Sequence, residues 1–209
     1  MPSSVSSTSL AFINPEHLFV QADALLLRLG RGSLRQADLR RAVSNAFYGL
    51  FHTILIAAAD EVAGRRMRGE PLWSLAYRSI SHQRLKSVCT DLRAQTLKPK
   101  IKPYEPVGGF GNHLAAIAGA VVELQDRRHV ADYDPSASLL RLDARTALQT
   151  ARSAVDRLSR LTENQRKAFL FLILFEPRRC GDAACDRERA DALKGVVTEK
   201  PAPHAKRRA

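Results

Sequence analysis

Residues 38 to 52 read DLRRAVSNAFYGLFH, and they hold the clearest helical pattern in the chain. Each residue of an α-helix turns by about 100°. Five polar side chains therefore share one arc of about 100°, and they are Arg41, Ser44, Asn45, Tyr48 and His52. Apolar side chains occupy the far side. Because unpaired buried polar groups cost free energy, this stripe predicts either the lining of a pocket or plain interhelical hydrogen bonds.

Helical signals continue on both sides of this segment. Pro15 suits a first helical position, Ser33 and Gln36 fit a capping box, and Gly64 is a stop signal. Apolar residues recur at three- and four-residue steps, and no strand alternation is found. We expect helices at about 14–29, 33–62, 79–94, 112–128 and 136–161. The last helix has an optional continuation through Thr162 into the apolar run 168–175.

These helices predict an all-α fold, an up-and-down bundle of four to six helices over residues 13–176. Residues 65–73 are expected to form a polar loop, and the Pro- and Gly-rich residues 96–112 to be irregular. The Ser-rich residues 1–12 and the polar, basic residues 177–209 are expected to be disordered flanks.

The charge balance is strongly basic. The chain of 209 residues has 33 basic and 21 acidic side chains, a net charge of +12. Such a balance favours an anionic partner, most often RNA or DNA. An arginine-rich composition that reflects genomic base content, with no anionic partner, is the alternative that the sequence leaves open.

Cysteine content and hydropathy bear on the compartment. Three cysteines, an odd and low number, argue against a disulfide framework and for a reducing cytoplasm. The start of the chain lacks the basic and apolar regions of a signal peptide. The longest apolar run, residues 168–175, is far shorter than the ~20 residues of a membrane helix. We expect a cytoplasmic protein with no membrane partner, no metal and no cofactor.

A second segment, RRHVADYDP at residues 127–135, places basic and acidic side chains close together. Arg127, Arg128 and His129 suit the end of a helix, where cations favour the negative end of the dipole. We predict that Arg41 or Arg128 pairs with Asp132. A solvated charge cluster at a helix end is the alternative.

The two segments together resemble the HEPN superfamily. The first reads R-x-x-S-x-x-F-Y-x-x-F-H from Arg41 to His52, and the second reads R-x-x-A-D-Y-D from Arg128 to Asp134. The resemblance implies a helical bundle, commonly dimeric, of toxin–antitoxin, abortive-infection or RNA-processing systems. Many members are metal-independent ribonucleases with an R-x(4–6)-H motif. In such a site Arg stabilises phosphate charge and His acts as acid or base.

This chain departs from that motif at its histidine. Tyr133 stands where the ribonucleases carry His, and a phenol with a pKa near 10 is a poor base at neutral pH. The resemblance therefore implies a tentative catalytic set of Arg128, Asp132 and Tyr133. His52 and His129 could replace the missing histidine only if the fold brings them together. We predict that the Arg41, Tyr48 and His52 stripe faces Asp132 and Tyr133 in one pocket, with Ser44, Asn45 and His129 as further pocket residues.

Three functions are compatible with this pattern. The first is a HEPN-like RNA-associated bundle, a toxin-like or accessory module of a toxin–antitoxin or defence system. The second is a catalytically inactive dimerisation or binding module, and the third is a metal-independent ribonuclease with a degenerate motif. The partners that the resemblance implies are a second copy in a homodimer, RNA or a nucleotide, and a nucleotidyltransferase-type antitoxin.

Overall fold

A computed structural model of the chain describes residues 13–27 and 35–177. Three predicted features lie outside the described residues: the flank at residues 1–12, the tail from residue 178 onward, and the capping residue Ser33. All of the helices below belong to one unit that ends at Glu176.

The described residues form α-helices and two short 3-10 helices, with no strand among them. The all-α prediction is therefore confirmed for this part of the chain. In chain order the elements are α1 (Pro15–Leu27), α2 (Gln36–Ala63), η1 (Arg65–Met67), α3 (Pro71–Arg78), α4 (His82–Leu92), η2 (Lys102–Tyr104), α5 (Gly111–Tyr133), α6 (Arg141–Ser159) and α7 (Glu163–Leu174).

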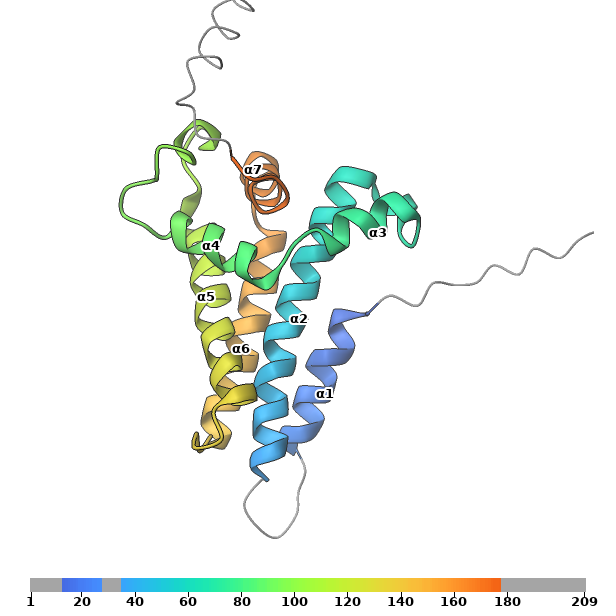
Figure 1. Cartoon of the computed structure of the whole chain (residues 1–209), viewed down its shortest axis with the longest axis vertical. Coiled ribbons are helices and arrows are strands. Elements are labelled where there is room, and N and C mark those ends of the chain that lie inside the picture. Colours follow the sequence, from blue (N-terminus) through green and yellow to red (C-terminus); the bar gives the residue numbers. More distant parts are fainter. Residues whose placement is uncertain (1–12, 28–34, 178–209) are drawn as a thin grey trace, which may run out of the picture. The chain divides into compact units, whose positions relative to one another are not determined.

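Four long helices, α1, α2, α5 and α6, make up the body of the bundle, and the chain reverses direction from each to the next (Figure 1). Helix α2 lies at the centre and packs against the other three. Its side chains Phe47, Leu50 and Ile54 are at most 1% exposed. Burial of one such side chain is worth about 1.5–3 kcal/mol, so α2 is the main source of core stability.

Helix α2 is also long and apolar enough to cross a membrane, judged by length and composition alone. However, 72% of its most apolar window is buried inside the bundle. A central core helix has this same composition because it is covered by other helices on most sides.

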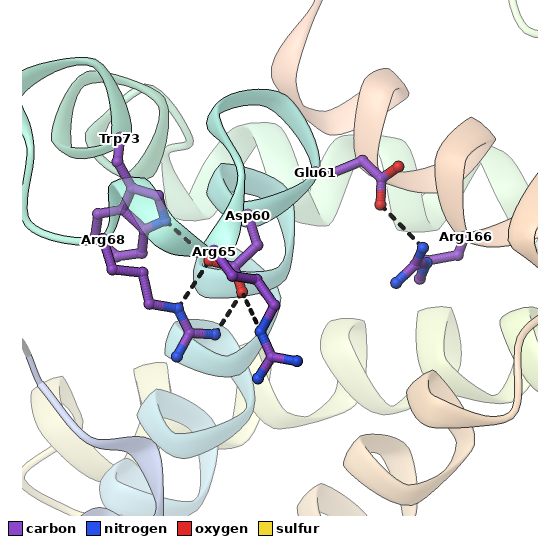
Figure 2. Close-up of polar contacts among 6 residues, drawn as sticks. All are labelled: Asp60, Glu61, Arg65, Arg68, Trp73 and Arg166. Carbon is purple, nitrogen blue, oxygen red and sulfur yellow. Dashed lines mark hydrogen bonds and ion pairs between the residues drawn. The ribbon is translucent and has the colours of Figure 1, made fainter.

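The predicted polar loop at 65–73 is wrong. These residues include η1 and the first turn of α3, and Trp73 is only 2% exposed. Figure 2 shows the cause: the carboxylate of Asp60, near the end of α2, accepts hydrogen bonds from Trp73 Nε1 at 3.0 Å and from Arg68 Nε at 2.8 Å. The polar composition of residues 65–73 predicted an exposed loop. The contacts with Asp60 instead hold these residues against α2.

One predicted helix end is wrong, and one alternative that the sequence left open is decided. Helix α5 does not stop at Arg128 but continues to Tyr133. Helix α6 does not run on into the apolar segment, because Thr162 begins the separate helix α7. Thr162 Oγ1 accepts a hydrogen bond from Gln165 N, and Gln165 Oε1 accepts one from Thr162 N, both at 3.3 Å. This reciprocal capping box stabilises a new start rather than a continuation.

The Pro- and Gly-rich stretch between α4 and α5 contains no α-helix before Gly111, as predicted, although η2 gives it one short turn. It is tied to the bundle by charge. Asp91 on α4 is 3% exposed and pairs with Lys98 and Lys100. These two lysines therefore neutralise a buried carboxylate.

Candidate functional site

One stripe of α2 carries the contacts that define the candidate site. Arg40, Ser44, Tyr48 and His52 recur every four residues and meet side chains or backbone of other helices. Residues four apart lie one above the other on a helix. The α2 stripe, defined as these four residues, runs beside the last turns of α5, which lies antiparallel to α2 (Figure 1).

Arg40 holds the C-terminal end of α5. Its Nη1 donates to the carbonyl oxygens of Ala131 at 2.9 Å and Asp134 at 2.7 Å, and its Nη2 donates to the carbonyl of Ala137. The last carbonyls of a helix have no partner within the helix. By satisfying them, Arg40 stabilises the extra turn of α5 that the sequence did not predict.

That extra turn brings Arg128 and Asp132 onto one face of α5. Arg128 Nε lies 3.5 Å from Asp132 Oδ2, and Ser44 Oγ donates a hydrogen bond to Asp132 Oδ1. Arg128 Nη1 donates to the hydroxyl of Tyr48 at 2.8 Å. The two segments that resemble the HEPN superfamily are thus in direct contact.

Arg128 is only 9% exposed. Its guanidinium carbon lies 5.5 Å from the ring centroids of both Phe47 and Tyr48, and 5.7 Å from that of Tyr133. Among the described residues its buried Nε has no hydrogen-bond acceptor, although Asp132 Oδ2 lies 3.5 Å away as an ion-pair partner. A buried donor without an acceptor costs free energy, about 1–3 kcal/mol, unless an anionic oxygen takes the bond.

Two histidines pack in an aromatic cluster around Tyr48, the residue that accepts from Arg128. His52 Nδ1 and the hydroxyl of Tyr77 share a hydrogen bond of 2.7 Å, and their rings stack at 6.0 Å. His82 lies edge-on to Phe51, with centroids 4.2 Å apart. Burial lowers the pKa of both histidines; His82 lowers the pKa of His52 further, and Arg128 lowers that of His82. Both histidines therefore favour the neutral imidazole more strongly than a free histidine does.

Sequence reasoning missed both Arg40 and His82. Arg40 and Arg41 are neighbours of the same type, so the choice of which one faces α5 depends on a rotation of 100° about the helix axis. His82 opens α4, and nothing in the residues around it distinguishes it from a surface histidine.

Three predicted pocket residues lie elsewhere. Arg41 is exposed and forms no ion pair within the described residues, so Arg128 is the partner of Asp132. Asn45 faces α1, where its Nδ2 donates to Gln21 Oε1 at 2.9 Å. His129 is exposed beside Tyr133, and no contact joins it to His52 in the described part of the chain.

Of the predicted site residues, the structure brings Ser44, Tyr48, Asp132 and Arg128 into contact, and His52 adjoins Tyr48 in the aromatic cluster. Tyr133 adjoins it through Arg128 but is 65% exposed.

In comparisons with known proteins, no family model, no curated protein and no solved structure matches the chain.

Proposed function

We propose that this chain is a HEPN-like bundle that associates with RNA, as a toxin-like or accessory module of a toxin–antitoxin or defence system. In this proposal it acts as a homodimer with a nucleotidyltransferase-type antitoxin as its partner. The observation that carries the RNA-binding part is Arg128, a nearly buried arginine whose Nε lacks a hydrogen-bond acceptor among the described residues.

The chemistry of Arg128 suits a phosphate. A guanidinium presents a planar fork of donors that matches the oxygens of a phosphate group. Three aromatic rings hold it in place, and Asp132 is the only carboxylate paired with it among the described residues. The net charge of +12 would attract a polyanion to this site over longer distances.

The first test is filter binding of the full chain to a single-stranded RNA over a salt series. Arg128→Ala is expected to weaken binding about 10- to 100-fold, the equivalent of one charge-assisted hydrogen-bonding group. Arg127→Ala is the matched control, because Arg127 pairs with the exposed Glu123 at 2.9 Å on the neighbouring face of α5. Its effect should stay within about threefold, the size of a surface ion pair.

A second variant separates binding from a structural role of Arg128. Asp132→Asn removes the charge that competes with phosphate, but it keeps an oxygen for the Ser44 hydroxyl. RNA should then bind more tightly than to wild type. Absence of binding by the wild-type chain at low salt, or equal binding by Arg128→Ala, would contradict the proposal.

RNA cleavage is a second candidate function, and His82 is the observation that favours it. The His82 ring lies 5.7 Å from that of Tyr48, whose hydroxyl accepts from Arg128. This imidazole is therefore placed to act as the base that Tyr133 cannot provide. If so, the purified chain cleaves RNA in the presence of EDTA, and His82→Gln abolishes cleavage while RNA binding persists. Wild-type chain that binds RNA but leaves it intact would remove this candidate alone.

A further inference from the structure

Tyr133 and His129 form an exposed aromatic pair on the last turns of α5. Tyr133 is 65% exposed, His129 is exposed, and their ring centroids lie 5.0 Å apart at 45°. Single exposed aromatic residues are common on protein surfaces and need no explanation. This pair differs because it directly adjoins the arginine of the candidate site.

Arg128 connects the pair to the phosphate site. Its guanidinium lies 5.7 Å from the Tyr133 ring and 5.5 Å from the buried Phe47 ring, so it stands between an exposed ring and the core. Because one nucleotide carries its base and its phosphate on the same sugar, a base placed on Tyr133 would bring its phosphate toward Arg128.

The backbone beneath the pair is held in place. Arg40 donates to the carbonyls of Ala131 and Asp134, the residues on either side of this last turn. A helix end that was frayed would lose conformational entropy when it ordered around a ligand. The Arg40 contacts remove most of that loss, so the rings are in position before a ligand arrives.

We propose that Tyr133, supported by His129, is a stacking platform for one unpaired base of a single-stranded RNA. This inference rests on the proposed function, because Arg128 supplies the adjoining phosphate contact. Bases inside a duplex are already stacked on both faces, whereas unpaired bases are free to stack on aromatic side chains. The platform therefore selects single-stranded over double-stranded RNA and tolerates any base sequence.

The test compares Tyr133→Ala, Tyr133→Phe and wild type in binding to one RNA in single-stranded and double-stranded form. Stacking of a base is worth about 1–3 kcal/mol, so Tyr133→Ala should weaken single-strand binding by about 5- to 150-fold. Tyr133→Phe should bind as wild type, because the ring is retained. Duplex binding should be unchanged in both variants.

Tyr104→Ala is the matched control. Tyr104 is 49% exposed but lies on η2, and it has no contact with Arg128 in the described structure. Its RNA affinity should equal that of wild type. Fluorescence quenching of a 2-aminopurine base in the RNA gives a direct readout of stacking, and it should disappear in Tyr133→Ala only.

The outcomes separate this inference from the function on which it rests. If Arg128→Ala weakens binding but Tyr133→Ala binds and quenches as wild type, the platform is wrong and the RNA function stands. If wild type binds no RNA, both are wrong. Circular dichroism of each variant tests whether weaker binding results from loss of folding. Because Tyr133 is exposed, its substitution is not expected to change the helical content.

Discussion

At the scale of single residues, neighbours of the same or similar type have different roles in this protein. Arg40 closes the end of α5, while Arg41 is exposed. Ser44 faces Asp132, while Asn45 faces Gln21 on α1. A shift of one residue turns a side chain by 100°, which is enough to move it from one neighbouring helix to another.

Gly49 shows the same sensitivity in the core. It lies where α1 crosses α2, and a Cβ added there would come within 2.6 Å of Phe19 Cζ. We expect Gly49→Ala to lower the free energy of unfolding by about 1–3 kcal/mol, the usual effect of overpacking. Urea denaturation of both proteins measures this difference.

Gly119→Ala is the control for that measurement. Gly119 also lies within a helix, but its added Cβ would meet only Arg93 Nε, at 3.9 Å. Alanine should be neutral there or stabilise the protein by up to about 1 kcal/mol through its higher helix propensity. Equal destabilisation by both substitutions would show that α1 does not pack tightly on Gly49.

At the scale of elements, the start of α3 is held to α2 by the carboxylate of Asp60. Asp60 on α2 accepts hydrogen bonds from Arg68 and Trp73, and Arg65 lies 3.8 Å away (Figure 2). Burial alone would raise the pKa of Asp60, but the Arg68 and Trp73 hydrogen bonds and the positive charge of Arg68 and Arg65 together lower it. The lowered pKa means that the folded state favours the ionised carboxylate.

The sign of the pH effect follows. The stabilisation is fully present above the unfolded pKa of Asp60, near 3.8, and is lost as the pH falls through the lower folded value. We expect Asp60→Asn to cost about 1–3 kcal/mol at pH 7 and to reduce the loss of stability below pH 4. Hydrogen exchange should show faster exchange in residues 65–78, while α5 and α6 stay protected.

Glu61→Gln is the control at the next position of α2. Glu61 Oε2 lies 3.2 Å from Arg166 Nη2 on α7, whose side chain is 44% exposed (Figure 2). The Glu61 side chain itself is 12% exposed, so loss of its charge is expected to weaken the contact between α2 and α7. The pair does not involve α3, so the exchange of residues 65–78 should not change. If both variants loosen α3 equally, Asp60 is not its anchor.

At the scale of the whole molecule, one end of the bundle carries a group of exposed arginines. Residues 178–209 include nine basic and five acidic residues, a charge of +4. Residues 1–177 therefore carry the remaining +8 of the net charge of +12. The end where α2 and α6 begin carries four exposed arginines without an ion pair among the described residues, namely Arg35, Arg41, Arg141 and Arg145. Acidic groups at this end are already engaged: Asp132 by Ser44, Asp134 by Ser136, and Asp143 by the amide of Leu140.

We expect these arginines to contribute to the salt dependence of RNA binding. Each phosphate contact on a single strand contributes about 0.7 to the slope of log affinity against log salt. We expect Arg41→Ala combined with Arg141→Ala to lower that slope by about 1.4. The matched control is Arg160→Ala with Arg166→Ala, which removes the same charge from paired arginines toward the α7 end. Equal slopes for the two double variants would place the RNA elsewhere.

Periodicity predicted the elements of the body of the bundle well, because their apolar stripes are local in sequence. The helices expected near 14–29, 33–62 and 112–128 correspond to α1, α2 and α5, with errors mainly at their ends. Two differences from the prediction, the longer α5 and the helix α3 in place of a loop, have the same kind of cause. The end of α5 is set by Arg40, and the start of α3 is held by Asp60, and both residues act from α2.

The sequence by itself determined the all-α fold of the described residues and the helix with a polar stripe at residues 38–52. It narrowed the partner of Asp132 to Arg41 or Arg128. It could do so because helical periodicity and short spacings are properties of the local chain. Only the tertiary structure decided that Arg40 rather than Arg41 meets α5, that His82 packs beside Tyr48, and that Arg128 retains an unsatisfied donor. These depend on the rotation of one helix against another and on the burial that follows, which no local pattern encodes.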